Sequence, residues 1–174
     1  MRIPFGMNRA RREAFCGTED TLYQRVLEIL APVLLLCAVT VIGVRWRALP
    51  QSIPTHFDLR GEPDAWGGKG NLFLLPGLGL LLDGAFALAL RFPQSWNMGI
   101  RKTPQNAPYL YRATRTMMAE LRFFIALWLS VFAVSLALSP DRLSPWIAWG
   151  LPWGMLVPTV VYLIRILRIR RSFQ

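Results

Sequence analysis

Long apolar stretches alternate with polar segments along the chain of 174 residues. A helix that crosses a lipid bilayer needs roughly 20 mainly apolar residues, because about 30 Å of hydrocarbon must be covered at about 1.5 Å per residue. Four stretches approach or reach this length, and they predict transmembrane helices over residues 28–45, 71–90, 123–139 and 144–164. We therefore expect an all-α protein, a polytopic transmembrane bundle of four helices.

The polar segments predict the domain organisation. Residues 1–27 are expected to form a cytoplasmic N-terminal arm, and residues 28–174 the four-helix membrane domain. Proline and glycine are frequent in residues 46–70, so we expect a compact loop between the first two spans. The segment from Tyr109 to the third span has two interpretations. It is either an amphipathic helix on the membrane surface or an extension of the third span.

The distribution of basic residues predicts the orientation of the helices. The chain contains 20 Lys and Arg and 10 Asp and Glu, and its net charge is +10. Of the basic residues, 15 fall within residues 1–27, 91–122 and 165–174, which share one side of a protein with four crossings. Basic residues are retained in the cytoplasm, so we expect both termini to be cytoplasmic. Because the charge follows the membrane topology, we expect no direct binding of nucleic acid.

The densest group of polar side chains lies in residues 46–70, on the non-cytoplasmic side. One imidazole and three carboxylates stand within nine positions, at His56, Asp58, Glu62 and Asp64. Such groups can bind a divalent cation or a cationic peptide. The alternative is that they hold the loop together through hydrogen bonds.

A single acidic residue, Asp83, lies near the middle of the second predicted span. An ionised carboxylate in hydrocarbon is costly, and no Lys or Arg lies inside the four predicted spans to pair with it, since Arg45 only marks the end of the first. We therefore expect Asp83 to be protonated, hydrogen-bonded to a hydroxyl group of another span, or open to water. It is either a functional group or a polar contact that holds helices together.

Motifs of the common enzyme classes are missing from the sequence. It contains no HExxH, no GxSxG, no Walker A sequence and no Rossmann glycine pattern. The spacing of the carboxylates around His56 also matches no standard metal motif. We therefore predict no catalytic residues, no metal site and no cofactor.

The loop resembles the signature of a bacterial membrane family, domain of unknown function 1648, which also forms the front part of SdpI-type immunity proteins. The matching residues are Leu49-Pro50, Ile53-Pro54-Thr55-His56-Phe57, Gly61-Glu62-Pro63-Asp64, Trp66-Gly67 and Lys69. Two positions differ, since Asp58 stands where the family commonly has Asn, and Gly68 where Ser is common. The resemblance is clear over residues 46–90. It implies a multi-pass protein of the bacterial inner membrane.

SdpI-type proteins protect cells from a secreted toxin and hold a transcription repressor at the membrane. The resemblance implies that the loop receives a ligand such as a secreted peptide, and that the basic inner face contacts a cytoplasmic protein. The expected ligand-binding residues are His56, Asp58, Glu62, Asp64, Trp66 and Lys69. Two other hypotheses are a small transporter or membrane enzyme that works through Asp83, and an accessory subunit of a membrane complex.

Overall fold

The computed structural model describes residues 21–58, 60–139 and 144–173, so most of the predicted N-terminal arm lies outside the described residues. Helices make up most of the described chain: α2 (Leu22–Arg45), α3 (Leu74–Ala89), α4 (Ala107–Leu138) and α5 (Pro145–Ser172). Two short strands lie between α2 and α3, namely β1 (Ser52–Phe57) and β2 (Pro63–Gly68). Short 3₁₀ helices precede and follow α3, at Lys69–Phe73 and Pro93–Ser95.

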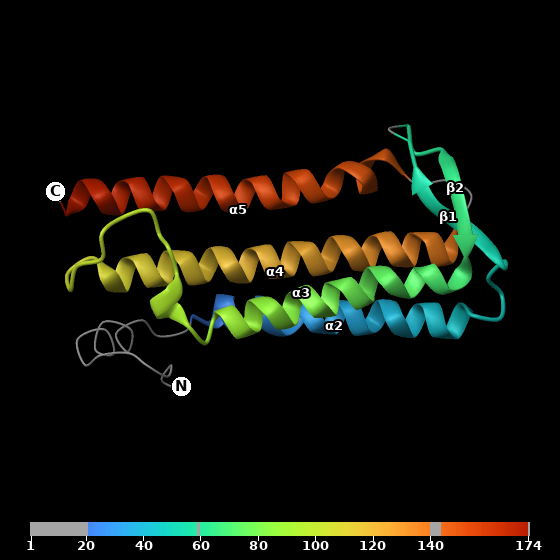
Figure 1. The fold of residues 1–174 in the computed structure, drawn as a ribbon, viewed down its shortest axis with the longest axis horizontal. Coiled ribbons are helices and arrows are strands. Elements are labelled where there is room, and N and C mark those ends of the chain that lie inside the picture. Colours follow the sequence, from blue (N-terminus) through green and yellow to red (C-terminus); the bar gives the residue numbers. More distant parts are fainter. Residues whose placement is uncertain (1–20, 59, 140–143, 174) are drawn as a thin grey trace.

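The helices lie side by side along the long axis of the molecule (Figure 1). α4 is central, because it packs against α2, α3 and α5, and α2 also packs against α3. The two strands lie beyond one end of the bundle, which we call the hairpin end (Figure 1). At the opposite end α2 and α4 begin and α5 finishes. We call it the basic end because Arg112, Arg165 and Arg168 lie there.

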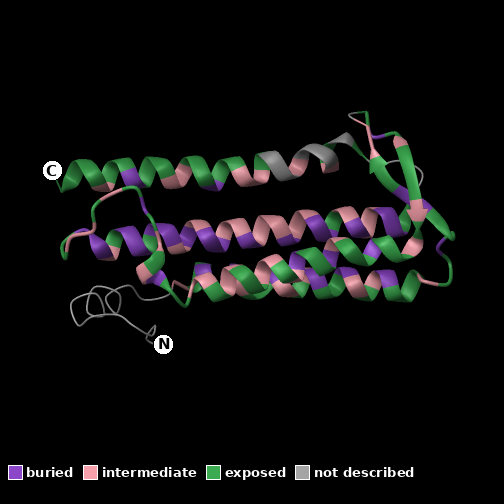
Figure 2. Ribbon diagram, in the orientation of Figure 1, coloured by how far each residue is buried: buried purple, intermediate pink, exposed green. Residues whose placement is uncertain are grey.

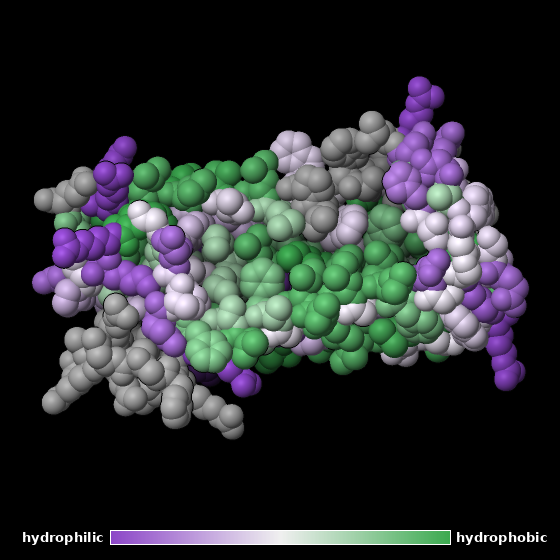
Figure 3. Space-filling model, viewed as in Figure 1, coloured by the Kyte–Doolittle hydropathy of each residue, from purple (hydrophilic) through white to green (hydrophobic). Residues whose placement is uncertain are grey.

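Three segments of the described chain are long and apolar enough to cross a membrane: Leu22–Arg45, Lys69–Ala89 and Ala107–Leu138. α5, the fourth helix, has 28 residues and packs along α4. On the face shown in Figure 3, apolar side chains form a band between two hydrophilic ends. The structure therefore confirms a helical bundle with three candidate spans and a fourth helix. The cytoplasmic location of both termini stays a prediction.

α4 decides between the two interpretations of the segment before the third predicted span. It runs without interruption over 32 residues, so this segment extends the span and is not a separate surface helix. Asn106 directly precedes α4, and its Oδ1 accepts the N–H of Thr103 at 2.8 Å, a hydrogen bond within the turn that leads into the helix. Pro108 follows in the first turn, where a missing N–H costs no helical hydrogen bond. As a consequence, Arg122 lies within the helix and not in a connection.

The all-α prediction is wrong within residues 46–70, because much of this loop folds into an antiparallel β-hairpin. Ser52 lies opposite Gly68 at the open end, and the register shifts after Pro54. Proline and glycine predicted a loop here, yet both strands of a two-stranded sheet are edge strands, which tolerate them. Gly61 has a φ of 79° between the strands, a backbone conformation that glycine adopts readily.

The hairpin and the helices share buried side chains. At the hairpin end, Ile42 of α2, Ile53 of β1 and Leu136 of α4 belong to one buried cluster. Further into the bundle, Leu35 of α2 packs with Ala126 of α4 in a second cluster. Buried residues follow the facing sides of the central helices, and exposed residues lie outside them (Figure 2). The hairpin is therefore fixed on the bundle by the same apolar contacts that join the helices.

α3 approaches its neighbours closely at Gly79. A Cβ atom at this position would overlap Leu35 of α2 and would lie 3.2 Å from Leu129 of α4. Gly77 and Gly84 also belong to α3, but a Cβ atom there would meet nothing within 4 Å. Small residues permit such close approach of helices in membranes. Gly79 is thus the glycine of α3 at which helix packing leaves no room for a side chain.

We predict that Gly79→Ala lowers the thermal stability of the purified protein in detergent, because overpacking a tight contact costs about 1–3 kcal/mol. Gly84→Ala is the matched control on the same helix. Its methyl group meets no close neighbour, so the change is expected to be neutral or stabilising by up to about 1 kcal/mol. Equal unfolding midpoints for the two variants would contradict the tight contact at Gly79.

Candidate functional site

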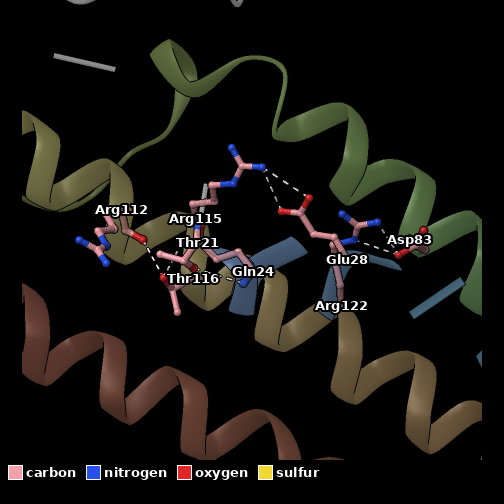
Figure 4. Close-up of polar contacts among 8 residues, drawn as sticks. All are labelled: Thr21, Gln24, Glu28, Asp83, Arg112, Arg115, Thr116 and Arg122. Atoms are coloured by element: carbon pink, nitrogen blue, oxygen red, sulfur yellow. Dashed lines mark hydrogen bonds and ion pairs between the residues drawn. The ribbon is translucent and has the colours of Figure 1, made fainter. Parts of the chain in front are cut away.

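Asp83 of α3 and Arg122 of α4 form an ion pair inside the bundle (Figure 4). Nε and Nη2 of Arg122 lie 2.9 and 2.8 Å from Oδ1 of Asp83. The side chains are 6% and 13% exposed, for Arg122 and Asp83 respectively. The prediction that no basic residue reaches Asp83 is therefore wrong. In the sequence the apolar run begins only at Phe123, which places Arg122 in the connection before the third span. In the structure α4 includes Arg122, and its side chain reaches Asp83 of α3.

Asp83 forms this ion pair instead of adopting one of the three states that we predicted for it. A carboxylate and a guanidinium that are both withdrawn from water cost far less together than apart. Since they lie on adjacent helices, their contact fixes how far α3 can slide along α4. The position of Asp83 therefore has a direct structural explanation.

Two further polar contacts join α2 to α4 between this pair and the basic end (Figure 4). Nε2 of Gln24 donates a hydrogen bond to Oγ1 of Thr116 at 2.8 Å, and both residues are buried. Oε1 of Gln24 accepts the N–H of Thr21, which completes a capping box at the start of α2. Nη2 of Arg115 lies 3.2 Å from Oε1 of Glu28. These contacts hold the first turns of α2 at a fixed place on α4.

At the other end of the bundle, His56 and Asp64 pair across the two strands. Nδ1 of His56 lies 2.5 Å from Oδ1 of Asp64, and the side chains are 69% and 49% exposed. This contact becomes an ion pair when the imidazole is protonated. It presents one imidazole and one carboxylate on the outer surface of the hairpin.

Asp58 serves the turn between the strands. Its Oδ1 accepts the backbone N–H groups of Arg60 at 2.8 Å and of Glu62 at 2.9 Å. These hydrogen bonds, that of Glu62 first, hold the pKa of the Asp58 carboxyl below its usual value. Asp58 is therefore a structural residue of the turn. The described residues contain no group of three or more His, Cys, Asp or Glu side chains that could hold a metal ion.

Lys69 joins the hairpin to the end of α2. Its Nζ donates a hydrogen bond to the backbone oxygen of Trp46 at 3.1 Å and lies 4.6 Å from the centre of the Trp46 ring. An ammonium group over an indole face is attracted by the ring quadrupole. Lys69 directly follows β2 and Trp46 directly follows α2, so this contact ties the end of the hairpin to the end of α2 and engages the charge of Lys69.

A pocket of about 270 Å³ lies between the hairpin, the start of α3 and the end of α4. Thr55 and Asn71 are the polar residues of its lining, and the others are apolar: Ile53, Pro54, Leu72, Leu74, Leu75, Phe132 and Leu136. Gly67 of β2 lets Asn71 lie against the hairpin, since a Cβ atom there would be 2.5 Å from Nδ2 of Asn71. Sequence analysis missed this pocket because its lining comes from segments that only the fold brings together.

The hairpin lies within the part of the chain that matches a protein family. Residues 33–80 match a domain of unknown function (DUF1648). The match begins in α2, includes both strands and finishes in α3, so the predicted family is confirmed for this part of the chain. No curated protein and no solved structure matches the chain. The likeness to SdpI-type immunity proteins stays a prediction.

Within the DUF1648 match, the structure divides the six predicted ligand-binding residues into two groups. Four have exposed side chains on the hairpin: His56, Glu62, Asp64 and Trp66. Asp58 and Lys69 instead bond backbone groups of the protein itself. Asp83 lies just beyond the match, near the middle of α3 and away from the hairpin. The exposed residues and the pocket therefore form the candidate site, and Asp83 is separate from it.

We predict that Asp83→Asn destabilises the purified protein by about 3–5 kcal/mol, because it leaves the buried guanidinium of Arg122 without its counter-charge. Combining it with Arg122→Gln removes both charges, so the double variant is expected to be more stable than Asp83→Asn alone. Denaturant unfolding of both single variants and the double variant in detergent measures the coupling. Strictly additive losses would show that the two side chains do not interact.

Proposed function

We propose that this chain is a membrane protein that binds an apolar or amphipathic peptide at its hairpin end, as a toxin-immunity or ligand-sensing protein. The observation that supports this proposal most strongly is the pocket beneath the hairpin. It combines an apolar lining with two polar side chains, Thr55 and Asn71, which is the usual composition of a ligand site.

The size of the pocket suits part of a ligand. Its volume of about 270 Å³ is slightly below the range of roughly 300–1,000 Å³ that is common for small-molecule sites. One or two apolar side chains of a longer molecule would fill it. A peptide satisfies this requirement, because the rest of its chain remains free to contact the surface around the pocket.

The hairpin offers a second means of holding a peptide. Each strand of a two-stranded sheet has one edge without a neighbouring strand in the sheet, and extended peptides commonly add to such edges through backbone hydrogen bonds. The exposed Trp66 and the His56–Asp64 pair on the same hairpin supply aromatic and polar contacts. Backbone pairing gives affinity in this mode of recognition, and the pocket gives selectivity for an apolar side chain.

The proposed setting is the cell membrane of a bacterium, with the hairpin end outside and the basic end in the cytoplasm. Three candidate spans and the DUF1648 match support a membrane protein. We propose α5 as the fourth crossing, since its 28 residues lie along α4 and residues 143–164 carry no charge. Four crossings place the Arg-rich segments on one side, in agreement with the retention of basic residues in the cytoplasm.

The alternatives have less support. Transport or catalysis through Asp83 would need its carboxylate to exchange partners, and Arg122 holds that carboxylate with two nitrogen atoms. An accessory role in a larger complex and the expected cytoplasmic protein partner both stay predictions.

We predict that Leu74→Trp strongly weakens protection in a bacterium that is killed by a secreted apolar peptide and survives when it expresses this chain. Leu74 lines the pocket and is 67% exposed, so an indole can occupy the site without disturbing the core. Burial of one apolar side chain stabilises a complex by about 1.5–3 kcal/mol. The peptide concentration that halves survival is therefore expected to fall roughly tenfold or more.

Leu78→Trp is the matched control for this experiment. Leu78 follows one turn later on α3 and is 49% exposed, but it does not line the pocket. Cells with this variant are expected to survive like cells with the wild-type chain at equal membrane levels. Failure of the wild-type chain to protect against any peptide of a secreted panel would contradict immunity. Equal protection by both tryptophan variants would exclude the pocket as the site.

A further inference from the structure

A larger cavity, of about 510 Å³, lies at the basic end of the bundle. Its floor is formed by α4, through Arg112, Ala113 and Thr116, which lie on one helical face. Tyr23 of α2 stands on one side. This volume falls within the range of roughly 300–1,000 Å³ that is typical of sites for small molecules and cofactors.

α5 forms the opposite side with Arg165, Arg168 and Ile169, which also share a helical face. α2 and α5 both pack on α4, so the cavity is a groove between two helices above the face of a third. The Gln24–Thr116 hydrogen bond fixes α2 against the floor of this groove. The three walls are therefore held by contacts that do not involve a ligand.

Three guanidinium groups line the cavity, from Arg112, Arg165 and Arg168. Among the described residues that line it, none is acidic, and no ion pair within the described chain engages these three side chains. Guanidinium groups bind phosphate oxygens through paired N–H donors. Tyr23 and Thr116 also line the cavity, but their hydroxyl groups donate hydrogen bonds within the protein, to Oε1 of Glu120 and to the backbone oxygen of Arg112 respectively. The cavity is thus suited to an anion with several oxygen atoms.

Exposed apolar residues lie close along the chain to those that line the cavity. Val26 of α2 and Ile164 and Leu167 of α5 are exposed within about one turn of residues that line it. In a ligand with a phosphate group and hydrocarbon chains, the phosphate group would contact the arginines and the chains would contact these apolar residues. Basic pockets between transmembrane helices commonly bind anionic lipid headgroups in this way.

We propose that this cavity binds the phosphate headgroup of an anionic phospholipid from the leaflet at the basic end, with Arg112, Arg165 and Arg168 as its phosphate ligands. A soluble phosphate compound shares the headgroup chemistry but would leave the adjoining apolar surface unused. The site is distinct from the pocket at the hairpin end. Lipid bound there would bridge α2, α4 and α5, and would tie α5 to the rest of the bundle.

The test compares lipid binding by the full chain and two double variants, purified in detergent and examined by native mass spectrometry with phosphatidylglycerol and phosphatidylcholine. Arg165→Gln with Arg168→Gln removes two guanidinium groups from the cavity. Arg170→Gln with Arg171→Gln removes the same charge from the same helix but leaves the lining intact. Since each basic residue near an anionic headgroup contributes about fivefold, the loss of two is expected to weaken phosphatidylglycerol binding roughly thirtyfold. The second pair is expected to leave it within about twofold.

Binding of phosphatidylglycerol by the wild-type chain, lost in the first double variant and retained in the second, would support the proposal. Equal losses in both double variants would overturn it, because they would show attraction to general surface charge. Equal binding of phosphatidylcholine would overturn it as well. Complete displacement of the lipid by excess inorganic phosphate would also overturn it, by showing that the site selects phosphate and not the lipid.

Discussion

The contact between Asp83 and Arg122 constrains how the bundle can be assembled. Opposite charges in an apolar interior must meet each other, and these two lie on adjacent helices, so they fix the register of α3 against α4. α3 follows directly from β2 through the 3₁₀ helix Lys69–Phe73. The register of α3 therefore sets where the hairpin rests on the end of α4. The pocket beneath the hairpin depends on that placement, since both α3 and α4 line it.

The two ends of the bundle differ in chemistry, and the apolar band between them keeps them apart. At the hairpin end, Asp58 and Lys69 are used within the fold, which leaves an apolar pocket and a few exposed polar groups. At the basic end, guanidinium groups surround a cavity without acidic residues in its described lining. α4 contributes to both sites, through Phe132 at one end and Arg112 at the other. One helix thus forms the common support for two sites of opposite character.

The sequence predicted the helices well because the thickness of the bilayer sets a minimum length for an apolar run. It failed where a structure depends on partners that are distant in sequence. The ion partner of Asp83 was not predicted, because Arg122 is charged and directly precedes the apolar run, so the sequence pattern places it in a connection. The hairpin was missed because proline and glycine indicate a loop more strongly than a short edge strand. The pairing of His56 with Asp64 depends on a strand register with irregularities, which no local pattern reveals.

The proposed bundle, which crosses the membrane four times with the hairpin end outside, is tested most directly by labelling single cysteines in intact bacterial cells. In a chain with Cys16→Ser and Cys37→Ala, cysteine is introduced at Gln51 near the hairpin, at Ser95 between α3 and α4, or at Ser172 at the end of α5. A thiol reagent that does not cross membranes is predicted to label position 51 and to spare positions 95 and 172 until the cells are opened. Labelling of position 172 together with position 51 in intact cells would contradict the fourth crossing, and protection of position 51 would contradict the orientation.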